Sequence, residues 1–427
     1  MRPTKPHAEH GGTQPGAAIM SSIPVIVSAK RTPIGKFFGG LSRVPSPVLG
    51  SYAIRAVLQE VGGALGGTGG SSASGIATHI DEVLMGCVLQ AGVGQNPARQ
   101  AALKAGLPDT MSAMTINKVC GSGLEAVMRA AAAIKAGDAE CVIAGGMENM
   151  TAAPHFARVR EGVKYGPATM EDHMAYDGLR CAFEACAMGD SADFIANKFG
   201  ITRTEQDRFA VQSHHRAAEA TKQGWFKSEI VALTGEQCMD KKLNGGAGVS
   251  ADEGIRAEST IEGVAKLRPA FGPQGTVTAA NASQISDGAA AVCVMSLSKA
   301  EKLGVKPIAK IVAYHTSGIA PKEIFAAPIE GVRGVLAKAG LSVKDIDLFE
   351  INEAFAAQAL CNIKELGIPE SKLNICGGGV ALGHPIGASG ARVLTTLIHQ
   401  LKRTGGKRGV AALCLGGGNS VAMVIEV

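Results

Sequence analysis

The fold of this chain is decided by residues 111–150, MSAMTINKVCGSGLEAVMRAAAAIKAGDAECVIAGGMENM. A β-type run at 114–119 predicts a strand, and the Ala-rich segment 124–135 predicts a helix with one buried apolar stripe. The apolar run 141–144 predicts a second strand, which ends at two glycines. Strand, helix and strand in this order indicate an α/β fold.

Cys120 lies where the first predicted strand turns into the helix, with Gly121 and Gly123 after it. Glycines permit a sharp bend and the close approach of another backbone. The free N–H groups and the dipole at the helix start, together with Lys118, favour a thiolate at this position. The turn is similar to the nucleophile elbow of hydrolases. A small buried core cysteine fits the same turn, so the chemical interpretation requires a base and oxyanion donors elsewhere.

The composition indicates which partners to expect. With 427 residues the chain can form two or three domains, and its hydrophobic content of 46% includes only 4% aromatic residues. A net charge of +5 spread along the chain argues against nucleic acid and suits a small polyanionic ligand. No apolar stretch of the sequence is long enough to cross a membrane.

The ten cysteines form no C-x-x-C pair, and most lie in apolar runs. This pattern argues against zinc and against a disulfide framework, and it predicts a reducing, cytoplasmic location. Residues 1–21 are polar and rich in Pro, Gly and His, so we expect a disordered extension, with Met20 as a possible alternative start.

The order of the predicted elements suggests a duplication. Strands at 23–29 and 82–89 alternate with helices at 49–61 and 97–105, which predicts a mostly parallel, buried sheet. The Gly/Ser-rich segment 62–75 is a flexible linker by composition. From about residue 309 the chain repeats this pattern, so two α/β units would pack their sheets around shared helices.

Between 150 and 285 the pattern changes to polar helices, at 191–199 and 203–223, joined by Gly-rich and charged loops. The second helix begins with a capping box, Thr202 to Glu205. We interpret this segment as an inserted, surface-exposed domain.

Three more polar, Gly-rich loops follow buried runs in the second half. Asn352 comes after the strand predicted at 347–351, His384 precedes the helix predicted at 391–401, and Cys414 precedes three glycines. A histidine or a cysteine in one such loop is as often structural as catalytic. Four such loops in one chain indicate a common site.

The sequence resembles the thiolase family, in particular its biosynthetic acetoacetyl-CoA branch, from Ile23 to Val427. The motifs that carry the resemblance are NKVCGSG, AGGMENM, KLRPAF, GTVTAANAS, NEAFAAQA, GGGVALGHPIGASGAR and CLGGG. The resemblance implies a five-layer αβαβα core of two duplicated halves with an inserted loop domain. The implied boundaries are an extension at 1–21, an N-terminal domain at 22–149 completed by 286–307, a loop domain for coenzyme A at 150–285, and a C-terminal domain at 308–427.

The implied activity is the reversible Claisen condensation of two acetyl-CoA to acetoacetyl-CoA and CoA, in a ping-pong mechanism. Cys120 would carry the acetyl group, His384 would take its proton, and Cys414 would remove a proton from C2 of the second substrate. By the same resemblance, one oxyanion site combines His384 with a water held by Asn352. The other combines the backbone N–H groups of Cys120 and Gly416.

The resemblance also assigns contacts to coenzyme A, which binds as a substrate, with no permanently bound cofactor or metal. The matching positions are Leu179, Met188, Arg256, Phe271, Ser283, Ile324 and Phe355. Two positions depart from the pattern: Ala187 stands where a histidine is usual, and Gly263 where a serine is usual. Residues 155–167 resemble the loop that joins dimers into tetramers, which implies a homotetramer.

Three other functions remain open at this stage. A degradative 3-ketoacyl-CoA thiolase of broader chain length is the main rival. A decarboxylating ketosynthase would lack Cys414. A catalytically inactive acyl-CoA-binding scaffold has no need for the full set of Cys120, Asn352, His384 and Cys414.

Overall fold

The computed structural model describes residues 23–65, 75–240, 246 and 248–427. The predicted extension at 1–21 and residues 66–74 of the predicted linker lie outside the described residues. In the described part, no helix is long and apolar enough to cross a membrane.

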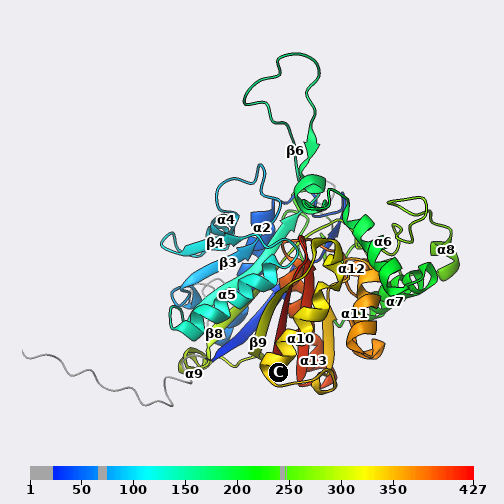
Figure 1. Cartoon of the computed structure of the whole chain (residues 1–427). Coiled ribbons are helices and arrows are strands. Elements are labelled where there is room, and N and C mark those ends of the chain that lie inside the picture. Colours follow the sequence, from blue (N-terminus) through cyan, green and yellow to red (C-terminus); the bar gives the residue numbers. More distant parts are fainter. Residues whose placement is uncertain (1–22, 66–74, 241–245, 247) are drawn as a thin grey trace, which may run out of the picture.

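A ten-stranded sheet runs through the molecule in the order β10-β11-β12-β9-β1-β8-β5-β3-β4, with β2 paired to β8 (Figure 1). The N-terminal half-sheet consists of β1 (Pro24–Arg31), β2 (Gly35–Lys36), β3 (Glu82–Gly86), β4 (Ser112–Ile116), β5 (Cys141–Asn149) and β8 (Ser286–Ser296). The C-terminal half-sheet consists of β9 (Ala309–Gly318), β10 (Leu348–Ile351), β11 (Arg408–Leu415) and β12 (Asn419–Glu426). The two half-sheets meet where Val25 pairs with Lys310 and Ile26 with Ala309.

The two half-sheets share one strand order, which confirms the predicted duplication. Counting outward from the β1–β9 junction, β1, β8, β5 and β3 correspond to β9, β12, β11 and β10. In each half the third and fourth strands are parallel, and the second strand is antiparallel to both of its neighbours. The two halves are therefore copies of one α/β unit.

The prediction of a mostly parallel sheet is wrong. Only the pairs β3–β4, β3–β5 and β10–β11 are parallel. In the C-terminal half-sheet, β11 turns straight into β12 through the glycines at 416–418, and a tight turn can only join antiparallel strands. In the N-terminal half-sheet, the chain returns as β8 after the long insertion that follows β5.

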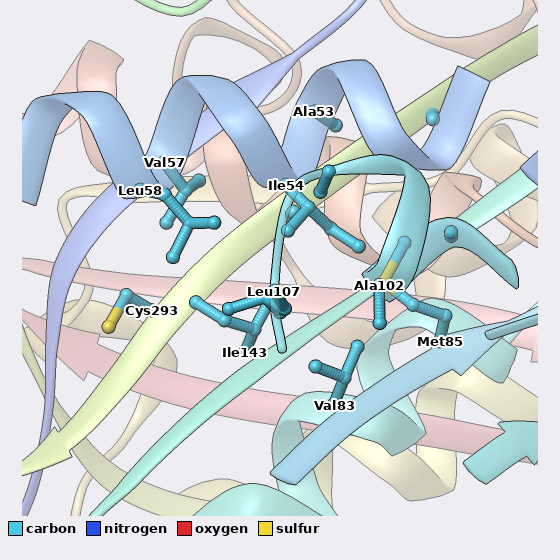
Figure 2. Packing of buried hydrophobic residues seen from close by; sticks show 14 of the residues in the cluster. Ala53, Ile54, Val57, Leu58, Val83, Met85, Ala102, Leu107, Ile143 and Cys293 are labelled. Atoms are coloured by element: carbon cyan, nitrogen blue, oxygen red, sulfur yellow. The ribbon is translucent and has the colours of Figure 1, made fainter. Parts of the chain in front are cut away.

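Helices complete the five layers of the core. Two helices, α5 (Ser122–Ala136) and α13 (Ser389–Thr404), lie between the half-sheets and share one apolar core with both. The outer face of the N-terminal half-sheet is covered by α2 (Ser46–Ala64) and α4 (Pro97–Lys104). Figure 2 shows this packing, with Ile54 and Val57 of α2 facing Val83 and Ile143 of the strands. The C-terminal half-sheet is covered by α10 (Ala327–Ala339) and α11 (Ala356–Leu366).

The two central helices touch backbone to backbone at their first turns. A Cβ on Gly390 would lie 2.2 Å from the backbone nitrogen of Leu124, and a Cβ on Gly123 would lie 2.7 Å from that of Ala391. Glycine at these two positions lets the beginnings of α5 and α13 approach each other at the centre of the molecule.

Residues 150–285 lie mainly against the C-terminal half. The helices α6 (Met188–Phe199) and α7 (Arg203–Lys222) share a core with α11. The predicted capping box is confirmed, since Thr202 Oγ1 accepts the Glu205 N–H at 3.3 Å and the Thr202 N–H reaches Glu205 Oε2 at 2.7 Å.

The remaining elements of the described chain are short. They are β6 (His155–Phe156), β7 (Glu171–Asp172), α8 (Ile261–Ala265), α9 (Leu297–Leu303) and α12 (Gly379–Leu382), with short helical turns at 174–178, 321–326, 343–345 and 370–372.

Two features of this insertion bear on the rest of the molecule. Between β6 and β7 the chain leaves the body of the molecule as a long loop (Figure 1). Elsewhere in the insertion, Glu229 and Asp252 contact the buried Arg31 of β1. Arg31 bonds Glu229 Oε1 at 2.6 Å and Asp252 Oδ1 at 2.7 Å, which ties the first strand to the insertion.

Candidate active site

One cavity of about 540 Å³ brings together loops from both halves and from the insertion. Its wall includes four of the five residues expected to be catalytic, namely Cys120, His384, Cys414 and Gly416. The fifth, Asn352, is fully buried behind the wall and contacts the His384 ring. Residues that are far apart in the sequence are therefore neighbours here.

Cys120 sits in a tight turn between β4 and α5. The strand ends at Ile116, earlier than predicted, which leaves residues 117–121 for the turn. Ser122 Oγ donates to the Val119 carbonyl at 2.6 Å and accepts the Lys118 N–H at 2.8 Å. Val119 has a φ of +47°, which is costly for a β-branched residue and must be held by its surroundings. The turn thus keeps the cysteine in one fixed orientation.

Burial raises the pKa of Cys120 to about 12, with Glu148 adding to the effect. The N–H groups of Cys120 itself and of Gly416 reach the sulfur and act in the opposite direction. Lys118 does not assist, because its ammonium group bonds Glu125 at 2.9 Å and Thr316 at 3.0 Å. The backbone N–H groups therefore favour the thiolate as expected, but burial outweighs them and Lys118 does not contribute, so Cys120 is a thiol that requires a base.

His384 has the properties of such a base. Its Nδ1 lies 2.6 Å from Ser389 Oγ, and the Ser389 hydroxyl donates to the Pro385 carbonyl at 2.8 Å. With its hydrogen used in this way, Oγ accepts from Nδ1–H, so Nε2 keeps a free lone pair. Burial, followed by the charge of Arg392, lowers the pKa of His384 to about 3. The ring is therefore neutral at physiological pH.

Asn352 follows β10 and contacts His384 from the other side. Its backbone N–H donates to the Ala412 carbonyl at 2.9 Å, and Nδ2 lies 3.4 Å from both ring nitrogens of His384. Its Oδ1 is buried without a hydrogen-bond partner among the described residues. A buried amide oxygen in this situation is suited to hold a water molecule or a polar substrate atom.

Cys414 is the second sulfur of the cavity, near the end of β11. Burial raises the pKa of its thiol, and the neighbouring Cys120 raises it further. The turn that follows contains Gly417 and Gly418, both with a φ of +83°, a conformation that side chains disfavour. This turn holds the Gly416 N–H toward Cys120.

The positions expected to contact coenzyme A fall into two groups. Six of them line the cavity: Leu179, Met188, Phe271, Ser283, Ile324 and Phe355. Arg256 is exposed and is not among the lining residues, and its backbone N–H donates to His214 Nδ1 at 3.1 Å. Of the two departures, Ala187 lines the cavity beside Met188, whereas Gly263 lies on the exposed helix α8.

Two residues in contact with the site were not predicted. Ser389 binds Nδ1 of His384, and Glu148 lies close enough to Cys120 to raise its pKa. Ser389 belongs to the same Gly-rich motif as His384, five residues later, so a search for a side chain that orients the base could have found it. Glu148 stands among apolar residues in AGGMENM, and an acidic residue in a buried strand was the available signal.

Comparison with known proteins gives consistent results. The model of the thiolase N-terminal domain matches residues 24–298, and that of the thiolase C-terminal domain matches residues 305–427. The chain is 50% identical to an acetyl-CoA acetyltransferase of Chromobacterium violaceum, over 94% of this chain and 98% of that protein. It is 48% identical to one of Cupriavidus necator, with the same coverage. A crystal structure of the Bacillus anthracis acetyl-CoA acetyltransferase superposes with a TM-score of 0.88 at 40% identity, covering 95% of this chain and 98% of that one. The chain belongs to the thiolase family.

Proposed function

We propose that this protein is an acetyl-CoA C-acetyltransferase, which joins two acetyl-CoA into acetoacetyl-CoA and releases CoA, and which also catalyses the reverse thiolysis. The observation that carries the proposal is the convergence of two sulfurs and a neutral imidazole in one cavity. One sulfur is oriented by two backbone N–H groups. Similarity to relatives named acetyl-CoA acetyltransferase supports the same activity.

In the first half-reaction Cys120 Sγ attacks the thioester carbonyl while His384 Nε2 takes the thiol proton. The carbonyl oxygen becomes negative and is stabilised by the N–H groups of Cys120 and Gly416, which already point to this place. The C–S bond to CoA then breaks, and the CoA sulfur receives a proton from Cys414, which becomes a thiolate, while His384 keeps the proton of Cys120 on Nε2. The acetyl group remains on Cys120.

In the second half-reaction the Cys414 thiolate removes a proton from C2 of a second acetyl-CoA, and the resulting carbanion attacks the acetyl carbon on Cys120. The bond between this carbon and Cys120 Sγ then breaks, acetoacetyl-CoA is released, and the Cys120 sulfur takes its proton back from His384. The thioester oxygen of this substrate becomes negative and needs donors, which His384 Nε2–H and a water on Asn352 Oδ1 supply. For that step His384 carries the proton taken from Cys120 on Nε2, while its Nδ1–H stays bonded to Ser389 Oγ. Ser389 thereby holds the ring in both of its protonation states.

The same proposal covers coenzyme A, the domains and the assembly. Residues 150–285 form the coenzyme A-binding loop domain between an N-terminal domain at 22–149, completed by 286–307, and a C-terminal domain at 308–427. The apolar wall around Leu179, Met188 and Phe271 suits the pantetheine arm, and the exposed Arg256 suits the nucleotide phosphates outside the cavity. The protein is cytoplasmic, in keeping with ten free cysteines, and forms a homotetramer through the loop between β6 and β7.

Mass spectrometry of the protein after mixing with acetyl-CoA tests the first half-reaction. We expect one acetyl group on Cys120, and none there in Cys120→Ser. Deuterium exchange at C2 of acetyl-CoA tests the second half-reaction, and Cys414→Ala should lose this exchange while Cys120 is still acetylated. Wild-type protein that is never acetylated would instead support an acyl-CoA-binding scaffold.

A second candidate, a 3-ketoacyl-CoA thiolase that accepts longer chains, is favoured by Ala187. This small side chain lies in the cavity wall beside Met188, where a larger one would narrow the space. Rates of thiolysis across acyl lengths separate the two candidates.

A further inference from the structure

Glu148 is a fully buried carboxylate near the end of β5. Burial raises its pKa to about 7, against the effect of the backbone N–H groups that bind it. An acidic side chain with no exposure is uncommon in proteins and requires hydrogen-bond donors around it. The steps proposed above do not use Glu148, although its charge raises the pKa of Cys120.

The donors to Glu148 come from two different loops. Oε2 accepts the N–H groups of Val88 at 3.0 Å and Gly387 at 2.9 Å. Oε1 accepts the N–H of Leu89 at 3.2 Å and lies 3.7 Å from the thiol of Cys87. One oxygen thus joins the loop that follows β3 to the loop that carries His384.

The backbone around this contact has no room to shift. A Cβ on Gly146 would lie 2.0 Å from the Gly387 carbonyl oxygen, and a Cβ on Gly86 would lie 2.7 Å from the same atom. A Cβ on Gly387 itself would lie 2.7 Å from Glu148 Oε2. The loop that carries His384 is therefore seated directly on the ends of β3 and β5, with Glu148 as its polar anchor.

These loops also form the wall beside the reactive sulfur. Val88, Leu89, Met150 and Ile386 make one apolar cluster, and Cys120 packs against it. Met150 and Ile386 line the cavity together with Cys120 and His384. Gly387 lies three residues after His384, so a displacement of Gly387 moves both the base and Ile386 relative to the nucleophile.

We propose that Glu148 is a positioning residue that sets the distance between Cys120 of the N-terminal half and the His384 loop of the C-terminal half, and with it the space for the acyl group. Glu148 acts through its bonds to Val88, Leu89 and Gly387, and takes no part in proton transfer. A carboxylate suits this task because it offers acceptors to three donors, whereas an amide presents one oxygen and its own N–H groups. The inference rests on the proposed thiolase reaction.

The test compares Glu148→Gln with Glu229→Gln, an equally buried glutamate that bonds Arg31 and Thr396 away from the cavity. We expect both variants to lose stability, so rates are expressed per active site, counted by acetylation of Cys120. For Glu148→Gln we expect kcat to fall about tenfold or more with KM for acetyl-CoA nearly unchanged, since small misplacements of reacting groups are costly. The ratio of kcat/KM between six- and four-carbon 3-ketoacyl-CoA should also change. For Glu229→Gln, kcat and the ratio of kcat/KM between the two chain lengths should match wild type.

Hydrogen exchange gives a measurement that does not depend on activity. In Glu148→Gln the amides of residues 87–89 and 385–388 should exchange faster than in wild type, while the rest of β5 and α13 stay protected. Glu229→Gln should not show this local change. If Glu148→Gln does not fold, Gly387→Ala serves instead, because its Cβ would push Gly387 away from Glu148 without altering the carboxylate. This variant should show the same faster exchange at residues 87–89 and 385–388 and the same fall in kcat.

Each result points to one conclusion. Wild-type kcat and wild-type chain-length ratio per active site in Glu148→Gln would show that Glu148 is only structural. A wild type that lacks thiolysis would overturn the proposed function, and the exchange experiment would still decide whether Glu148 anchors the His384 loop. Faster exchange at both loops together with impaired kcat supports the proposal.

Discussion

We expect Ala187 to influence the length of the acyl chain that is accepted, because it lines the cavity next to Met188. Replacing it by histidine adds a polar ring to the wall and removes room for additional methylenes. Each buried methylene contributes about 0.8 kcal/mol, or about fourfold in specificity. We therefore expect measurable thiolysis of six-carbon 3-ketoacyl-CoA by the wild type and a selective loss of it in Ala187→His.

The measurement is kcat/KM for four-, six- and eight-carbon substrates in both proteins. The four-carbon value should change little, which serves as the internal control. Equal discrimination against six carbons in the wild type and in the variant would exclude Ala187 as the determinant of length.

His214 predicts how stability depends on pH. Its Nδ1 accepts the Arg256 N–H, and burial, followed by the charge of Arg256, lowers its pKa from 6.5 to about 4. Because the folded pKa lies below the unfolded one, its contribution to stability is complete above about pH 6.5 and is lost as the pH falls toward 4. At pH 5 the loss is about 2 kcal/mol.

In His214→Asn the amide oxygen can still accept from Arg256 but does not titrate. Urea unfolding at pH 7 and pH 5 should therefore show a smaller loss of unfolding free energy for the variant than for wild type. The same loss in both proteins would mean that other groups cause the acid sensitivity.

Single residues also show what the sequence can predict about a site. Cys120 and Cys414 were identifiable because each stands where a predicted strand meets a Gly-rich turn, and His384 because it stands in a Gly-rich loop before a predicted helix. The protonation state of these residues could not be predicted, because it depends on burial and on partners that are remote in sequence. Lys118 illustrates this, since its charge is bound by Glu125 and Thr316, and a lysine two residues from a cysteine indicates nothing about where its ammonium group points.

At the scale of elements, the contact between α5 and α13 predicts a large effect from one methyl group. In Gly390→Ala the new Cβ would lie 2.2 Å from the Leu124 backbone nitrogen, so the two helices must separate. We expect a loss of stability of about 1–3 kcal/mol, together with a fall in activity, because both helices begin at the active site.

Gly63→Ala is the matched control. Gly63 is also helical, but it is exposed near the end of α2, and its Cβ would meet nothing within 4 Å. This variant should gain about 0.5–1 kcal/mol, as expected for alanine in place of glycine in a helix. Urea midpoints measure both variants, and a neutral Gly390→Ala would show that the helices adjust without strain.

Elements differ in how far the sequence predicts them. The α7 capping box was correct because both of its partners lie within one turn of the helix. The end of β4 was misplaced, because the run up to Val119 is β-type in composition while its last residues form the turn. The direction of β8 was also missed, since 136 residues separate the end of β5 from the start of β8 and local pattern says nothing about pairing over that distance.

At the scale of the whole molecule, the loop between β6 and β7 predicts the assembly. It carries four exposed apolar side chains: Val159, Val163, Tyr165 and Met170. Apolar side chains on a projecting loop are stabilised by burial against another subunit. In the homotetramer proposed above, replacing residues 158–169 by a short Gly/Ser linker should therefore leave a dimer.

Light scattering of the purified protein gives the mass directly, and the variant should have half the mass of the wild type. Ile261→Ser, which removes an exposed apolar side chain from α8, should leave the mass unchanged. An unchanged tetramer after loop replacement would place the contact elsewhere on the surface.

The matching strand order of the two halves has a meaning for ancestry. Since α5 and α13 both lie between the half-sheets, the loops before them hold corresponding places in the two halves. In one copy this loop holds Cys120, the proposed nucleophile, and in the other it holds His384, the proposed base. A protein made of one half alone would have needed a second copy of itself to bring two such loops together. After fusion of the two copies, each loop could change independently. A duplication thus accounts for the placement of Cys120 and His384 in corresponding loops of one chain.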